Sequence, residues 1–127
     1  MSYIDWEYYS SLFAEVPEEE FDRLCAKAAV KMNAYTHMRV KDFVAAYNEE
    51  EATDWQKQMQ EQIRYTLCEL MNALYVQETS GMGNGISSVS NDGYSESYKV
   101  TTAQEREAQL TSVIRSGLSG TGLAGAL

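Results

Sequence analysis

The chain has 127 residues, enough for one domain with a modest core and too few for a second one. Hydrophobic residues make up 44% and charged residues 23%, which is typical of a folded protein and argues against a disordered one. The formal net charge is −9 without a cluster of Lys and Arg, so the composition argues against tight or sequence-specific DNA binding. An acidic protein surface can still serve DNA in the opposite sense, because like charge keeps a duplex that moves past the surface from binding to it.

The amino terminus has no basic region and no apolar segment typical of a signal peptide. The longest strongly apolar window, residues 70–76, is far shorter than the roughly 20 residues that cross a membrane. We therefore expect a protein made in the cytoplasm, without a membrane partner. Cys25 and Cys68 fall at apolar helical positions and match no metal or disulfide pattern, which predicts two buried thiols.

Apolar residues recur at helical intervals in the first third of the chain. They predict a short aromatic helix over residues 6–13, a core-facing helix over 17–35 and a shorter helix over 40–47. Pro17 and the three carboxylates after it suit a first helical turn, because they complement the positive end of the helix dipole. We interpret these acids, and those at 49–51, as solvated charge and not as a cation site.

The longest predicted element is a helix over residues 54–78, capped by Thr53 or Asp54. At 1.5 Å per residue it is about 37 Å long and should form the spine of the bundle. Its apolar stripe consists of Trp55, Met59, Ile63, Leu67, Leu70, Met71 and Leu74. Cys68 and Tyr75 widen this stripe, so a second face could meet a neighbouring subunit. A stripe that contains Met is more often core than interface.

Residues 81–100 are the one long stretch that cannot be helical. Glycines at 81, 83 and 85 open it, and Asn91-Asp92-Gly93 supplies the positive φ that a tight turn requires. Alternating residues then predict an extended arm or a β-hairpin, inserted before the last helix and projecting from the helical body. A small helical body with such an arm is usually built to contact a neighbour.

The last predicted helix begins at a capping box formed by Thr102 and Glu105 and continues to Leu118. The tail, residues 117–127, holds four glycines and no charged side chain. It is either a loose end or a strap that becomes ordered against another chain. The fold class is thus mainly α, a single helical domain over residues 1–127 with an arm at 81–100.

No catalytic constellation accompanies these elements. His37 is the only histidine, and no nearby acid, second histidine, serine or cysteine stands at motif spacing. The glycines at 81–85 follow a predicted helix instead of a strand and lack the Lys of a phosphate loop, so they more simply end that helix. We expect no enzymatic activity, no cofactor and no metal.

The order of these segments along the chain is nevertheless distinctive. It comprises Tyr8-Tyr9, a helix opening Glu18-Glu19-Glu20-Phe21, a glycine-rich break, a serine-rich segment ending Tyr94-Ser95-Glu96-Ser97-Tyr98, a last helix and Gly120-Thr121-Gly122-Leu123. This order resembles the head-tail connector (head-completion adaptor) proteins of long-tailed double-stranded DNA phages and prophages. The likeness covers nearly the whole chain; the serine-rich segment and the tail are its most specific pieces.

The resemblance implies a structural virion assembly protein at the head-tail junction, made in the cytoplasm of a bacterial host. It implies a ring homo-oligomer, dodecameric by family resemblance, that docks beneath the portal protein and extends the DNA channel. The next connector or tail-completion protein would bind below, and DNA would pass without sequence-specific binding. We expect subunit or partner contacts from Ile86, Val89, Tyr94, Tyr98 and Leu123.

The alternative is a small helical regulatory module that binds one protein partner. In that case the stripe from Trp55 to Leu74, or the aromatic amino terminus, would form the contact. A one-to-one complex would favour the module, and a ring would favour the connector.

Overall fold

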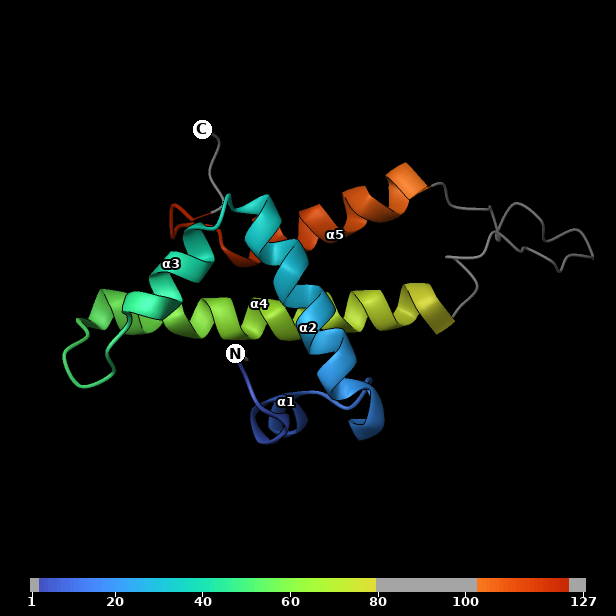
Figure 1. Cartoon of the computed structure of the whole chain (residues 1–127), viewed down its shortest axis with the longest axis horizontal. Helices are drawn as coiled ribbons and strands as arrows, with labels where there is room; N and C mark the ends of the chain where they lie inside the picture. Colours follow the sequence, from blue (N-terminus) through green and yellow to red (C-terminus); the bar gives the residue numbers. More distant parts are fainter. Residues whose placement is uncertain (1–2, 80–102, 124–127) are drawn as a thin grey trace, which may run out of the picture.

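The computed structural model describes residues 3–79 and 103–123, and within these ranges the protein is mainly helical and has no strand. The five helices are α1 (Trp6–Leu12), α2 (Glu18–Tyr35), α3 (Arg39–Ala46), α4 (Asp54–Thr79) and α5 (Ala103–Gly117), as Figure 1 shows. The predicted helices are therefore confirmed to within a few residues at their ends. The predicted arm or hairpin over residues 81–100 lies outside the described residues, as does Thr102.

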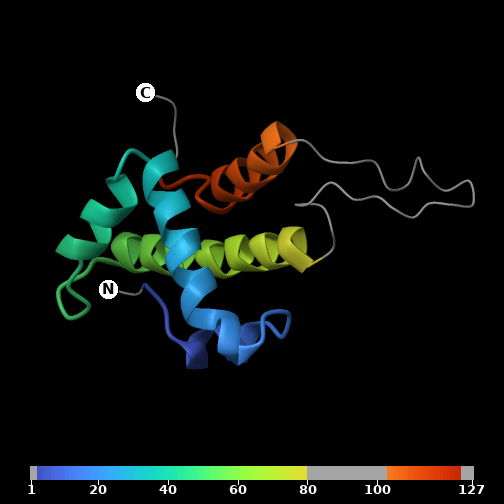
Figure 2. The same ribbon diagram turned by 45° about the vertical axis from the view of Figure 1, so that its right-hand side comes forward.

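The long helix α4 is the spine, and α2 and α5 pack on it (Figures 1 and 2). α2 crosses α4 obliquely, whereas α5 runs beside the second half of α4. The face of α4 toward the core is fully covered and consists of Ile63, Leu67, Leu70, Met71 and Leu74. Burial of each such side chain stabilises the fold by about 1.5–3 kcal/mol, so this face contributes substantially to stability.

Local hydrogen bonds fix where the helices begin. The Asp5 carboxylate accepts from the Tyr8 N–H at 2.9 Å and caps α1. At α4, the Gln56 N–H donates to Thr53 Oγ1 (3.1 Å), and the Thr53 N–H donates to the Gln56 side-chain oxygen (2.9 Å). Thr53 and Gln56 thus form a reciprocal capping box, which confirms Thr53 as the predicted cap.

The turn between α2 and α3 uses two left-handed residues, His37 (φ 55°) and Met38 (φ 66°). Their N–H groups donate to Ala34 O (3.2 Å) and Asn33 O (2.7 Å), which satisfies carbonyls at the end of α2. Thr36 is buried, and its hydroxyl donates to Met32 O at 2.9 Å. The chain therefore reverses sharply, and α3 lies beside α2. His37 is exposed at this turn.

The helices α4 and α5, which flank residues 80–102, are tied together beside this segment. The buried Gln77 of α4 donates its side-chain N–H groups to Arg106 O (3.1 Å) and to the Gln109 side-chain oxygen (2.6 Å) of α5. At the other end of α5, the Gln62 side chain donates to Gly117 O and Ser119 O. Both ends of α5 are thus fastened to α4.

Two expectations differ from the structure. Trp55 is 52% exposed and does not belong to the core stripe of α4. At 100° per residue it lies about 80° around the helix from Ile63, in the first turn, where little covers it. The tail differs as well, because Leu118, Thr121 and Leu123 are buried in their own chain. Residues 118–123 are therefore folded onto their own chain and are not a loose end.

Left-handed glycines make this tail compact. Gly120 (φ 85°) and Gly122 (φ 79°) adopt a conformation that other residues disfavour. Between them, the Thr121 hydroxyl donates to Leu118 O (2.7 Å) and accepts from the Leu123 N–H (3.1 Å). The chain thereby folds back so that Leu118 and Leu123 both reach the core.

Candidate protein-binding surfaces

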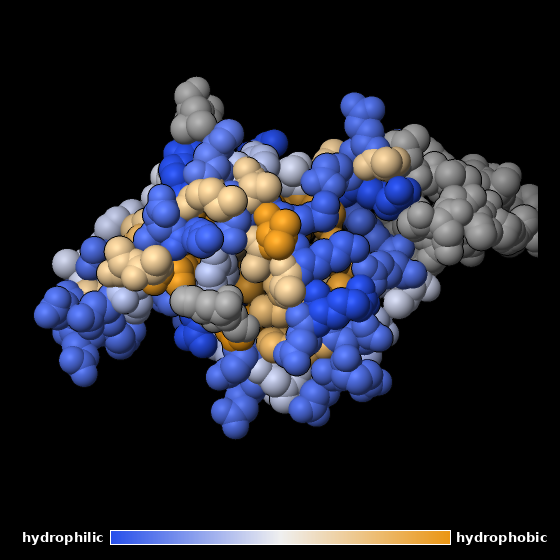
Figure 3. Space-filling view, viewed as in Figure 1, coloured by the Kyte–Doolittle hydropathy of each residue, from blue (hydrophilic) through white to orange (hydrophobic). Residues whose placement is uncertain are grey.

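An apolar groove lies between α2 and α3 and has a volume of about 330 Å³. We call it the α2–α3 groove; its lining residues are Tyr3, Ala26, Ala29, Val30, Asn33, Lys41, Val44 and Ala45. Figure 3 shows apolar side chains gathered over α2 on this side of the molecule. Val30 is 67% exposed, which makes it the most exposed large apolar side chain among the described residues.

The sequence of α2 explains why this surface forms. Ala28 is fully buried toward α4, and Ala26 and Val30 each lie about 160° around the helix from it. They form an exposed ridge of small and branched side chains on the outer face, which we call the α2 ridge. An apolar ridge on an outer helix face has no role in the subunit's own core and is a feature of contact surfaces.

One edge of the α2–α3 groove is held by the amino terminus. The Tyr3 hydroxyl donates to the Asn33 side-chain oxygen at 2.7 Å. Burial raises the pKa of Tyr3, and its hydrogen bond to Asn33 offsets part of that increase. The Tyr3 ring therefore stays a neutral wall of the groove.

A second groove, of about 400 Å³, lies behind α4 between the end of α1 and α5. We call it the rear groove; its lining residues are Phe13, Glu69, Asn72, Ser112, Val113 and Ser116. Around α4, Asn72 lies about 180° and Glu69 about 120° from the buried Ile63. Arg23 and Lys27 of α2 pair with Glu78, which lies about 180° around α4 from Glu69, so α2 with its groove and the rear groove lie on opposite sides of α4.

Aromatic side chains hold the wall of the rear groove. Phe13 stacks on Tyr9 (centroids 5.6 Å apart) and contacts the ring of Tyr65 (5.3 Å). The Tyr9 hydroxyl donates to the Asn72 side-chain oxygen at 2.5 Å and accepts from the Val16 N–H at 2.9 Å. Burial is the main cause that raises the pKa of Tyr9. This neutral network fixes both the wall and the Asn72 floor of the groove.

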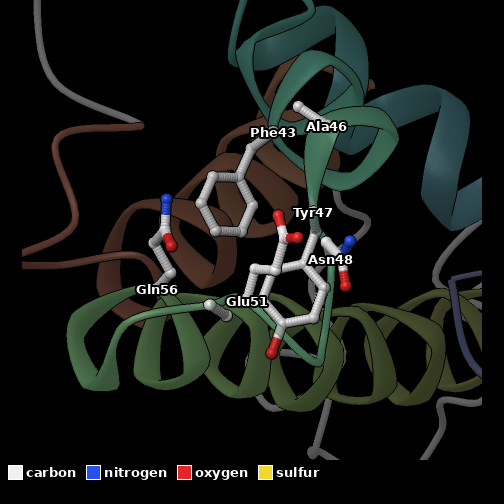
Figure 4. A pocket seen from close by; sticks show the side chains of 7 residues that line it. Phe43, Ala46, Tyr47, Asn48, Glu51 and Gln56 are labelled. Carbon is white, nitrogen blue, oxygen red and sulfur yellow. The ribbon is translucent and has the colours of Figure 1, made fainter.

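A third hollow, of about 260 Å³, lies between the end of α3 and the start of α4 (Figure 4). Phe43 and Gln56 approach each other from the two helices across it, and Tyr47 lies over α4. The Tyr47 hydroxyl donates to a Glu49 carboxylate oxygen at 2.6 Å, and this hydrogen bond raises the pKa of Tyr47 to about 12. The hydrogen bond to Glu49 thus keeps the Tyr47 phenol protonated. This phenol is therefore not suited to proton transfer.

Charged side chains cluster beside the end of α4. Glu78 accepts from Arg23 (2.8 Å) and from Lys27 (3.0 Å), both on α2. The hydrogen bond from Arg23 is the main cause that lowers the pKa of Glu78 to about 2. We call the helical body formed by residues 3–79 and 103–123 the trunk. Together with Gln77, these ion pairs hold the end of α4, where the chain leaves the trunk.

The sequence-predicted contact residues are distributed unevenly over the structure. Ile86, Val89, Tyr94 and Tyr98 lie outside the described residues. Leu123 is 8% exposed, so a contact with another subunit would require this part of the tail to move. The sequence predicted no contact role for Val30, Lys41 or Glu69, which line the two grooves. An apolar Val30 on the charged side of α2 was the one signal that could have revealed the ridge.

Cys25 and Cys68 are both buried. Burial raises the pKa of Cys68 to about 12, so this thiol stays protonated. Over residues 3–79 and 103–123, no three His, Cys, Asp or Glu side chains come together where they could hold a metal ion. None of the helices in the described ranges combines the length and the apolar character needed to cross a membrane.

No protein-family model matches the chain, and neither a curated protein nor a solved structure does.

Proposed function

We propose that the chain is a structural protein of virion assembly, a ring-forming head-tail connector of a long-tailed double-stranded DNA phage or prophage. In this role it docks beneath the portal protein and extends the DNA channel toward the tail. The observation that carries the proposal is the order of parts along the sequence, above all the serine-rich segment ending at Tyr98 and the Gly120-Thr121-Gly122-Leu123 tail.

Three features of the trunk support a protein that joins others. It is mainly helical, it has grooves on two opposite faces, and α4 and α5 are tied by Gln77 at the base of residues 80–102. A segment of that length, doubled back on itself, reaches at most about 40 Å from its base. We propose that it is an arm or β-hairpin whose Ile86, Val89, Tyr94 and Tyr98 contact a neighbouring subunit or the portal.

The partners follow from this role. They are identical copies in a ring, dodecameric by family resemblance, the portal above and the next connector or tail-completion protein below. The net charge of −9 suits a wall along which DNA passes without binding. We assign the protein a mechanical and not an enzymatic role, at the head-tail junction of the virion.

The test is a mass measurement by native mass spectrometry on the full chain, alone and mixed with the portal protein of the same phage or prophage. We expect a complex that contains many copies of the chain in a fixed ratio to the portal ring. A complex with one copy of the chain would contradict the connector. It would favour the regulatory module, with the apolar α2–α3 groove as its peptide-binding site.

The arm has its own test. Amide exchange over residues 81–100 is compared between the free chain and the chain assembled on the portal. We expect protection to rise on assembly, because main-chain groups of the arm would pair with a neighbour. Equal and strong protection in both states would contradict a contact by the arm.

A further inference from the structure

The α2 ridge and the rear groove both present apolar side chains at the surface. On the ridge these are Val30, which is 67% exposed, and Ala26, which lies one turn away and is also exposed. The rear groove is concave, with Phe13 and Val113 on opposite walls. Packing between helices places a ridge of side chains into a groove between others, and small residues let the helices approach closely.

The two surfaces also complement each other in charge. Lys41 lies beside the α2 ridge in the lining of the α2–α3 groove, and Glu69 lies in the lining of the rear groove. Each is the one charged side chain in its lining. Within residues 3–79 and 103–123, neither takes part in an ion pair. Opposite charges on two facing surfaces set the register of a contact and suppress wrong pairings.

The ridge and the groove lie on opposite faces of one subunit, so a single chain cannot bring them together. When the ridge of one copy fills the groove of the next, the contact is heterologous and repeats from copy to copy. A two-fold dimer would instead place the same patch on both partners. Repetition of this contact closes into a ring when the rotation between copies allows it.

We propose that the α2 ridge of one copy packs into the rear groove of the next, with Lys41 opposite Glu69. This inference rests on the proposed ring and assigns the two faces that build it. Val30 fills the space between Phe13 and Val113, and the ion pair lies at the edge of the contact. The trunk thereby supplies an interface between subunits that is separate from the arm.

Charge reversal tests the pairing. Lys41→Glu places two acids at every contact, and Glu69→Lys places two cations there. Each variant alone should assemble about tenfold more weakly than the unmodified chain, or worse, because like charges meet. A one-to-one mixture of the two variants should recover assembly, since every contact in an alternating ring again joins opposite charges. The double variant should recover it as well.

Assembly is measured by analytical ultracentrifugation and native mass spectrometry on full chains, alone and with the portal protein. Lys57→Glu and Glu50→Lys are matched controls, since both residues are exposed and lie in neither groove lining. Thermal unfolding of each variant checks that the trunk is intact. We expect the controls to assemble like the unmodified chain.

The outcomes separate the two proposals. If the single variants assemble like the unmodified chain, or if the mixture and the double variant do not recover, the assigned faces are wrong while the ring stands. If the unmodified chain forms no multi-copy assembly even with the portal, both the ring and its interface are overturned.

Discussion

Gly117 of α5 lies so close to Thr66 of α4 that a Cβ atom built on the glycine would stand 2.1 Å from the Thr66 hydroxyl oxygen. No pair of real atoms of this kind approaches so closely, so the two helices meet here only because residue 117 has no side chain. The buried Thr66 cannot move aside without disturbing the core.

Gly117→Ala should therefore destabilise the protein by about 1–3 kcal/mol, the usual cost of overpacking. Urea unfolding monitored by circular dichroism measures the change. Ser119→Ala, two residues further on and exposed, is the control and should change stability little. An alanine variant as stable as the unmodified protein would show that α5 packs on α4 differently.

Tyr9→Phe tests the hydroxyl that joins α1 to α4. It removes the donor to Asn72 and leaves the N–H of the buried Val16 without its acceptor. We expect a loss of about 1–3 kcal/mol in the free energy of unfolding. The matched control is Tyr8→Phe, whose hydroxyl donates to the exposed Glu61 and should matter less. Equal losses in both variants would contradict the buried network.

Trp55 and Ile63 belong to one predicted stripe but to different environments in the structure. Ile63→Ala should cost about 2–5 kcal/mol, because Ile63 is fully buried and its truncation leaves a cavity. Trp55→Ala should change stability by less than about 0.5 kcal/mol, since Trp55 is exposed. Thermal unfolding of both variants compares them. A large loss of stability for Trp55→Ala would show that Trp55 belongs to the core.

Glu78 gives stability a dependence on pH. Its pKa is lowered to about 2 in the folded protein from an ordinary value of 4.5, chiefly by the hydrogen bond from Arg23. The stabilisation is therefore complete above pH 4.5 and is lost as the pH falls toward 2. Glu78→Gln should be less stable than the unmodified protein at pH 7, and the gap should narrow across this window.

The control for that experiment is Glu50→Gln, which removes an exposed carboxylate from a loop. It should leave the pH dependence of unfolding unchanged. A gap between Glu78→Gln and the unmodified protein that stays constant from pH 7 to pH 2 would contradict the ion pair with Arg23.

The helices could be predicted from the sequence because each one carries its own periodic signal. Ile63, Leu67, Leu70 and Leu74 recur at intervals that only a helix brings to one face. Thr53 caps that helix through a bond to a residue three positions away. Signals of this kind are local, so a single sequence contains them.

The surfaces could not be predicted in the same way, because they depend on how helices cross. Lys41 lies beside Val30 only because His37 and Met38 adopt left-handed conformations that turn α3 back along α2, and neither is a glycine. Glu69 reaches the rear groove because α1 and α5 leave that face of α4 open. Leu123 is buried for a similar reason, since the turns at Gly120 and Gly122 return the tail to the trunk.

The most direct measurement for the connector role is an electron-microscopy image of this protein bound to the portal of its phage or prophage. We expect a ring of identical copies on the portal axis, with residues 81–100 reaching toward a neighbouring subunit or the portal. A single copy bound to one side of the portal, or no bound copy, would contradict it.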